Sequence, residues 1–341
     1  MLAKAIDGAV LARANARQAN AAAAPWLHGE VARRMAERLP VIRLQPHTVV
    51  DWWSHAGGSR AVLVRAYPAA RQLRVEAAPA DMPIALPKTP WWSAQRWRRT
   101  APALSEAAVP VAAGQLVWAN MMLHAVPDPT SVMQRWRRAL AVDGFLMFST
   151  LGPDTLAGLR DIYREAGWGP AHAPFTDMHD LGDMLVAVGF ADPVMDQERL
   201  RLTWPTPMAL LAELRTLGAN ADPARHAGLR TPRWRDRLLS ALAERADSEG
   251  RIALDFELVY GHAFNPPPRA KLAGETRVAV DDLRAMARSP RRPGRTSEPR
   301  PERSGAGLKF AVAPLAFACL RRCTGVDLPS LPVPLCTDTC P

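Results

Sequence analysis

Hydrophobic residues follow two different periods along most of the chain, and these periods predict alternating helices and strands. Segment 27–42 places apolar side chains four residues apart, which is typical of one face of an α-helix, and Pro40 ends that helix. The next segment, 47–53 (HTVVDWW), is apolar and rich in residues that favour strands. We therefore expect a helix followed by the first strand of a sheet.

Strand-like and helix-like segments continue to alternate through the first half. Ser59 is expected to cap a helix that runs to Tyr67, and Thr130 to cap the helix that follows it. The pair Asp143-Gly144 is expected to turn into the next strand. Strands are predicted over 71–77, 115–120 and 145–150. This alternation predicts parallel strands with helices on both faces of the sheet.

The second half continues the same pattern with longer elements. Helices are predicted over 154–167 and 180–190, and Gly189 ends the second of them as a glycine after a helix commonly does. A strand is predicted within 191–204. Apolar residues alternate strictly over 252–260, which indicates a half-buried strand running antiparallel to its neighbour.

Two Thr-Pro pairs lie between these late strands. Thr206-Pro207 and Thr231-Pro232 each combine a capping hydroxyl with a proline in the first turn, so each should open a helix. The two helices form a helical insertion at about 205–248. The predicted fold class is thus α/β, with a doubly wound, mostly parallel sheet.

Composition divides the chain into four parts. Residues 1–45 are predicted to form N-terminal helices, and 46–268 the main α/β domain. Residues 269–307 are rich in Pro, Arg and Ser and have no hydrophobic period, so we expect a largely disordered linker. The last part, 308–341, contains all four cysteines: Cys319, Cys323, Cys336 and Cys340. Their symmetric spacing allows a four-thiolate zinc site, whereas the alternative is a tail that contributes nothing to the body; no other metal site is expected.

Composition and charge narrow the function classes. Apolar residues make up 48% of the chain and charged residues 22%, as in globular proteins. The net charge is +10, and about half of it comes from residues 288–341, so the body is only mildly basic. Its arginines form no single stripe, which makes nucleic-acid binding an unfavoured interpretation. We see no continuous apolar targeting or membrane segment, and expect a cytoplasmic protein.

Candidate chemistry lies where the first two strands end. Asp51 closes the first predicted strand and Glu76 the second, and an acid at the second position commonly binds a ribose diol. Of the glycines expected in the turn between them, only Gly57 and Gly58 remain, and Trp53 brings a large ring into it. The alternative interpretation of this stretch alone is a strand–helix turn without a ligand.

Longer motifs resemble the class I S-adenosylmethionine-dependent methyltransferases, and within them the malonyl-acyl-carrier-protein O-methyltransferase family of biotin synthesis. The resemblance covers about residues 27–268. It is carried by VVDWWSHAGG, LVWANMMLHAVPDP, FSTLGPDTLAGLR, FTDMHDLGDMLVAVGFADPVMDQE and FELVYGHAF, of which the last three are the most specific. It implies a seven-stranded sheet that binds S-adenosylmethionine.

The resemblance also implies which residues surround this cofactor. Glu76 would bind the ribose, the backbone from Trp53 to Gly57 would lie near the methionine portion, and Asn120 beside the adenosine or the reacting centre. Glu106 would lie near the adenine edge. The implied cofactor-binding set is Asp51, Trp53, His55, Gly57, Glu76 and Asn120. Trp53 and His55 depart from the glycines of the family pattern.

The implied reaction is methylation of the free carboxyl of a malonyl thioester carried on acyl carrier protein. A carboxyl group with a pKa near ~4 is already ionised at neutral pH, so no general base is expected. Side chains that follow strands are candidates to line the substrate site: His124, Thr150, Tyr260 and His262. Two alternatives stay open, namely a degenerate methyltransferase-like binding or regulatory protein and a methyltransferase for another substrate, such as RNA or a small acid.

Overall fold

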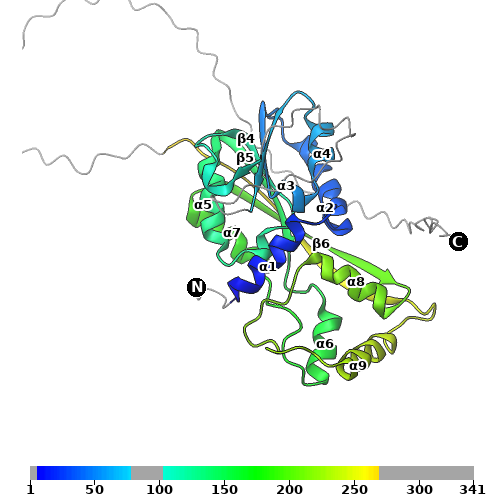
Figure 1. Ribbon diagram of the computed structural model, residues 1–341. Coiled ribbons are helices and arrows are strands. Elements are labelled where there is room, and N and C mark those ends of the chain that lie inside the picture. The colour runs from blue at the N-terminus through cyan, green and yellow to red at the C-terminus, as the bar shows by residue number, and fades with distance from the viewer. Residues whose placement is uncertain (1–5, 78–102, 269–341) are drawn as a thin grey trace, which may run out of the picture. The chain divides into compact units, whose positions relative to one another are not determined.

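The computed structural model describes residues 6–77 and 103–268 of the chain (Figure 1). All of them belong to one compact unit, Met1–Lys271. Among these residues, no helix has the length and apolar character needed to cross a bilayer. The predicted linker and the four cysteines lie outside the described residues, and the predicted domain boundaries stay predictions.

A mixed sheet forms the centre of the fold. Its strands are β1 (Thr48–Trp52), β2 (Arg71–Glu76), β3 (Leu104–Ser105), β4 (Gly114–Ala119), β5 (Leu140–Leu151), β6 (Ala191–Trp204) and β7 (Ile252–Phe264). They pair in the order β3-β2-β1-β4-β5-β7-β6. The first five pair in parallel, and β7 runs antiparallel to both β5 and β6. The predicted seven-stranded, mostly parallel sheet is confirmed.

Helices cover both faces of this sheet, as expected of a doubly wound fold. The helices are α1 (Gly8–Ala19), α2 (Trp26–Ala36), α3 (Ser54–Gly57), α4 (Arg60–Ala66), α5 (Pro129–Ala139), α6 (Ala157–Glu165), α7 (Met178–Val188), α8 (Pro207–Leu217) and α9 (Pro232–Ala243). Apolar residues of α2, α4 and α6 share one core cluster with those of α8 and α9. Those of α5 and α7 share another.

Several predicted helix ends are confirmed. The Thr206 hydroxyl accepts a hydrogen bond from the Ala209 amide at 3.1 Å, and that of Thr231 from the Trp234 amide at 3.2 Å, so both Thr-Pro pairs open helices. Gly189 has φ +98° and closes α7. The first turns of α8 and α9 are thus each stabilised by a capping threonine, as the sequence predicts.

Other predicted ends are wrong by a few residues. Helix α5 begins at Pro129 and is capped by Asp128, whose carboxylate accepts from the Ser131 amide, and not by Thr130. Ser59 and Tyr67 do flank α4 as predicted, but the Ser59 hydroxyl donates to the Gly57 carbonyl and makes no capping hydrogen bond. Helix α2 ends at Ala36, and a 3-10 turn, Leu39–Val41, follows it.

The predicted turn at Asp143-Gly144 lies inside β5. This strand already begins at Leu140, and Asp143 has φ +62° there. Asn265 exchanges backbone hydrogen bonds with both residues of the pair, which keeps the irregular stretch joined to the end of β7. The pair therefore marks an irregularity within a strand rather than the beginning of one.

Candidate functional site

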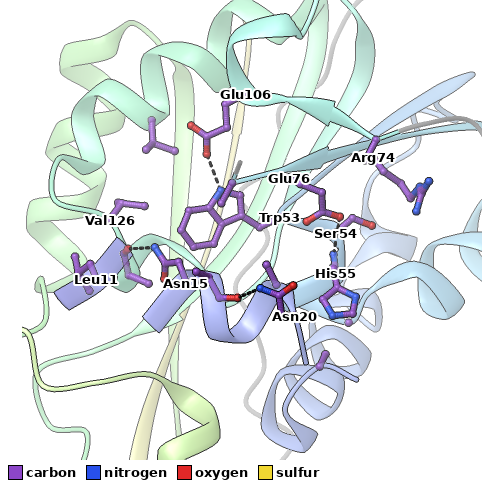
Figure 2. A pocket seen from close by; sticks show the side chains of 18 of the residues that line it. Leu11, Asn15, Asn20, Trp53, Ser54, His55, Arg74, Glu76, Glu106 and Val126 are labelled. Atoms are coloured by element: carbon purple, nitrogen blue, oxygen red, sulfur yellow. Dashed lines mark hydrogen bonds between the residues drawn. The ribbon is translucent and has the colours of Figure 1, made fainter. Parts of the chain in front are cut away.

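A cavity of about 1410 Å³ opens beside the carboxyl ends of β1 and β2 (Figure 2). Ligands of open α/β sheets bind at this edge. The walls of the cavity are α1, residues 22–24, the loop after β1, the end of β2, Glu106 and the start of α5. Its volume exceeds the ~300–1,000 Å³ of common small-molecule sites, so a nucleoside-sized ligand has room.

Helix α1 closes one side of this cavity. Asn15 donates a hydrogen bond to the Ala125 carbonyl at 3.3 Å, and Gln18 donates to the Thr216 carbonyl at 3.0 Å. The Asp7 amide donates to the Ala221 carbonyl. These contacts join α1 to both the loop after β4 and the helical insertion. Sequence patterns did not reveal this wall, because its alanine-rich helix carries no chemical motif.

Two residues of the loop after β1 have the left-handed backbone conformation that glycine favours, although only one of them is glycine. Trp53 has φ +53° and Gly58 φ +65°, both in the left-handed region. A bulky residue rarely adopts this conformation, whereas glycine does so without strain. A Cβ atom on Gly57 would come within 3.3 Å of the Asn120 carbonyl oxygen, so the loop packs closely on the end of β4.

Trp53 and Glu106 form a hydrogen-bonded bridge in the cavity wall. The indole Nε1 of Trp53 donates to Glu106 Oε1 at 2.6 Å, and that of Trp52 donates to the same oxygen at 3.1 Å. Arg135 pairs with the other carboxylate oxygen at 3.1 Å. Both oxygens of Glu106 are therefore engaged, and Figure 2 shows the Trp53 ring beside it within the cavity.

Glu76 faces the same cavity from the end of β2. Its Oε1 accepts a hydrogen bond from the His55 backbone amide at 3.1 Å, while Oε2 bonds to no described residue. Burial raises the pKa of this carboxyl, and the bond from His55 opposes that effect. One oxygen of Glu76 thus fixes the loop through the His55 amide. The His55 ring points to the Ala21 carbonyl, at 2.9 Å.

Asp51 lies behind the loop rather than in the cavity lining. It is 2% exposed, and its Oδ2 accepts from the Ser54 hydroxyl at 2.5 Å. Its Oδ1 is buried and has no hydrogen-bond partner among the described residues. Burial raises the pKa of Asp51 to about 7. The side chain therefore holds the first turn of the loop.

Asn120 is a buried clamp at the end of β4. Its Nδ2 donates to the Gly57 carbonyl at 2.6 Å and to the His28 carbonyl at 2.7 Å, and its Oδ1 accepts from the Ser149 hydroxyl. The ring of His28 continues this network, with Nδ1 2.7 Å from the Ala56 carbonyl. Asn120 therefore joins four segments without itself lining the cavity.

Sequence reasoning missed several residues of the site besides His28. Arg60, Arg74, Asp128 and Arg135 all line the cavity. Arg74 had a usable signal, because it lies two residues before Glu76 and side chains two apart in a strand share a face. Asp128 lies within the motif LVWANMMLHAVPDP, whereas Arg60 and Arg135 belong to none of the motifs named above.

The predicted substrate-lining residues lie in two places. Thr150 and His124 approach each other, with Oγ1 and Nδ1 3.4 Å apart, and the His124 ring meets Phe175 edge-on. Burial lowers the pKa of His124 to about 3. The pair follows β4 and ends β5, so it belongs to the carboxyl edge, although neither residue lines the cavity.

Tyr260 and His262 lie in β7, farther along the sheet. The Tyr260 hydroxyl donates to Glu198 at 3.3 Å, and the Arg38 guanidinium lies over its ring at 3.9 Å. Burial lowers the pKa of His262. Neither residue is part of the cavity lining, and their role as substrate-lining groups stays a prediction. Within 6–77 and 103–268, no three side chains are grouped as metal ligands.

Glu76 gives one end of the cavity a carboxylate. The Glu76 carboxylate lines it with one oxygen that has no hydrogen-bond partner among the described residues, while the other oxygen accepts from the His55 amide. The strand order, the antiparallel β7 and the acid at the end of β2 together define the fold of a class I S-adenosylmethionine-dependent methyltransferase.

Comparison with known proteins identifies the family. No protein-family model matches the chain. It is 37% identical over 253 residues to the malonyl-[acyl-carrier protein] O-methyltransferase of Gallionella capsiferriformans, covering 73% of this chain and 87% of the relative. It is 39% identical over 255 residues to that of Laribacter hongkongensis, covering 72% and 86%. The chain belongs to the malonyl-[acyl-carrier protein] O-methyltransferase family.

The chain is also similar to solved structures, at lower sequence identity. The YcgJ protein of Bacillus subtilis superposes with a TM-score of 0.45 at 11% identity, over 70% of this chain and 99% of that one. The phosphoethanolamine N-methyltransferase 2 of Haemonchus contortus, in complex with S-adenosyl-L-methionine, superposes with a TM-score of 0.39 at 14% identity, over 72% and 54%.

Proposed function

We propose that this chain transfers a methyl group from S-adenosylmethionine to the free carboxyl of a malonyl thioester on acyl carrier protein, a step of biotin synthesis. Family membership supports the activity, since the relatives carry this name over most of their length. The observation that carries it in the structure is the Glu76 carboxylate, which faces a nucleoside-sized cavity at the carboxyl edge of the sheet. A cytoplasmic location stays a prediction.

The chemistry explains why the site needs no general base. S-adenosylmethionine supplies an electrophilic methyl group on a sulfonium. A malonyl carboxylate oxygen forms the new C–O bond as the S–C bond breaks, and no proton moves, because a carboxyl with a pKa near ~4 is already ionised. The protein's part is to orient the two reactants and exclude water.

Three features of the chain serve these tasks. Glu76 would accept hydrogen bonds from the ribose hydroxyls through Oε2, which has no partner among the described residues. Helix α1 covers the cavity and is held to the loop after β4 by Asn15. Asn120 ties the loop after β1 to β5 through Ser149, which fixes the walls relative to one another.

The direct test is methyl transfer by the full chain. Purified protein is incubated with methyl-labelled S-adenosylmethionine and malonyl-acyl carrier protein, and the carrier is analysed by mass spectrometry for one methyl ester on its malonyl group. We expect label on malonyl carrier protein and none on acetyl carrier protein, which lacks the free carboxyl. Label on neither, with folded protein and a relative active in parallel, would reject the proposed reaction.

Glu76→Ala provides a matched binding test. Loss of the carboxylate should weaken S-adenosylhomocysteine binding at least tenfold in calorimetry, whereas Glu198→Ala, an acid outside the cavity, should leave it unchanged. Unchanged binding by Glu76→Ala would remove that residue from the site.

A second candidate is a binding protein that has lost catalysis, and the ring of Trp53 in a glycine position is the observation that favours it. Saturable binding of S-adenosylmethionine without transfer to any malonyl thioester would support this candidate.

A further inference from the structure

Helix α1 carries two exposed arginines, and neither of them belongs to the cavity lining. Arg13 and Arg17 lie four residues apart, so they share one side of the helix. Neither forms an ion pair with another described residue, and α1 itself contains no acidic side chain. The solvent side of this cavity wall is therefore basic.

The last turn of α8 adds a third arginine beside these two. Arg215 is exposed and has no ion-pair partner among the described residues. Gln18 donates to the Thr216 carbonyl at 3.0 Å. Arg17 donates to the Gly218 carbonyl at 3.4 Å. The ends of α1 and α8 therefore meet, and Arg13, Arg17 and Arg215 form what we call the basic junction.

The acidic residues beside α1 and α8 are less exposed than these arginines. All of them are half-buried: Asp7, Glu213 and Asp222. Asp7 pairs with Arg225 at 2.8 Å, and the Glu213 carboxylate accepts from the Trp204 indole at 2.7 Å. The charges that this part of the surface presents to a partner are therefore positive.

The basic junction lies at an open side of the cavity. Ala12, Ala16 and Ala19 of α1 line the cavity and are themselves exposed, so solvent reaches the cavity along this helix. Arg13 and Arg17 directly follow two of these alanines in the chain. A protein bound at the junction would therefore stand beside an entrance to the cavity.

We infer that the basic junction is the docking surface for acyl carrier protein, an acidic protein, which from there delivers the malonyl thioester to the cavity. This inference rests on the proposed function for the identity of the carrier. Complementary charges on two proteins speed their association and orient them, and salt weakens the attraction between exposed charges. The junction thus acts on the carrier and leaves binding of the methyl donor unaffected.

The test compares two acceptors in steady-state methyl transfer: malonyl-acyl carrier protein and malonyl-pantetheine, which has the thioester without the protein. For Arg17→Glu/Arg215→Glu we expect KM for the carrier to rise at least tenfold, and kcat/KM for malonyl-pantetheine to stay within twofold of the wild type. Arg65→Glu/Arg138→Glu is the matched control and should change neither value. These two arginines are also exposed, also lie in the last turns of helices, and do not line the cavity.

The outcomes decide the docking surface in both directions. With the wild type, KM for the carrier should rise with salt, and it should rise less steeply with Arg17→Glu/Arg215→Glu. An unchanged KM for the carrier in that variant would reject the docking surface. An equal loss with both acceptors would also reject it, since the two arginines would then hold the cavity wall. If thermal melting shows that the double Glu variant does not fold, Arg17→Gln/Arg215→Gln replaces it, with an expected rise of a few-fold.

Binding of the carrier without catalysis separates this inference from the proposed function. Calorimetry with malonyl-acyl carrier protein should show at least tenfold weaker binding by Arg17→Glu/Arg215→Glu than by the wild type and by the Arg65→Glu/Arg138→Glu control. That result without methyl transfer to either acceptor would reject the reaction and keep the docking surface. Equal binding by all three proteins, or no binding by the wild type, would reject the docking surface itself.

Discussion

The two ends of the sheet are built in different ways. At one end, β6 and β7 form a ribbon of 14 and 13 residues that pairs from Trp204 with Ile252 to Ala191 with Phe264. At the other, β1, β2 and β3 have 5, 6 and 2 residues, and the shape of their edge depends on side chains that reach across it. The ribbon follows from the alternation of apolar and polar residues along each strand. The edge of the sheet at the cavity depends instead on contacts between residues far apart in the chain.

This difference explains how a loop with few glycines can keep its course. Asp51, Glu76 and Asn120 each hold one part of it, through the Ser54 hydroxyl, the His55 amide and the Gly57 carbonyl. Hydrogen bonds from side chains at the ends of three strands thus stabilise a loop conformation that glycines would otherwise make accessible. As a consequence, Asp51, Glu76 and Asn120, which were expected to contact a ligand, make hydrogen bonds that stabilise the loop.

The largest effect is expected from a cavity in the ribbon. Phe256 of β7 is fully buried and its ring lies 6.4 Å from that of Trp204. Phe256→Ala should lower the free energy of unfolding by about 3–5 kcal/mol, the usual cost of removing a buried aromatic ring. Chemical denaturation measures this loss.

Phe256→Leu is the control and should cost clearly less, because most of the volume is kept. Binding of S-adenosylhomocysteine by the fraction that stays folded should be unchanged. A loss below about 1 kcal/mol for Phe256→Ala would mean that the ribbon adds little to the stability of the folded unit.

The same contrast sets how much of the molecule can be predicted from sequence. The alternation over 252–260 and the pairs Thr206-Pro207 and Thr231-Pro232 act within a few residues, so the strand and both helix starts were predicted correctly. The bridge from Trp53 to Glu106 joins residues 53 apart in the chain, and no local pattern predicts it.

Asn120 shows the same limit for a predicted site residue. Its place after β4 was correctly identified, but its hydrogen bonds to Gly57, His28 and Ser149 depend on three other segments. Sequence position therefore indicated that Asn120 belongs to the site edge, and only the fold shows it acting as a clamp. The cavity wall formed by α1 could not be predicted for the same reason, because its hydrogen bonds are with residues more than 100 positions away in the chain.

A pH-dependent effect of intermediate size is expected at the site edge. Burial raises the pKa of Asp51 to about 7, so the folded protein binds this proton more tightly than the unfolded chain does. The stability that Asp51 contributes is complete below its ordinary pKa near 4 and is lost as the pH rises through about 7. The loss between pH 5 and pH 8 is roughly 2–3 kcal/mol.

Asp51→Asn isolates this contribution, because the amide is neutral and still accepts from Ser54. The difference in unfolding free energy between variant and wild type should move in favour of the variant from pH 5 to pH 8. Lowered pKa values of His28 and His124, also caused by burial, act in the opposite direction but are common to both proteins and cancel in the difference. A difference that does not vary with pH would show that Asp51 is ionised throughout.

The smallest effect is expected at the start of α5, where the helix begins at the cavity wall. Asp128 caps this helix by accepting from the Ser131 amide, and its other oxygen accepts from the Ser131 hydroxyl. Asp128→Ala should cost about 1 kcal/mol of unfolding free energy, the usual value for an N-cap. Thr130 lies inside the first turn and caps nothing, so Thr130→Ala should stay within about 0.5 kcal/mol of the wild type. Equal losses for the two variants would show that Thr130 also caps α5, contrary to the hydrogen bonds of Asp128.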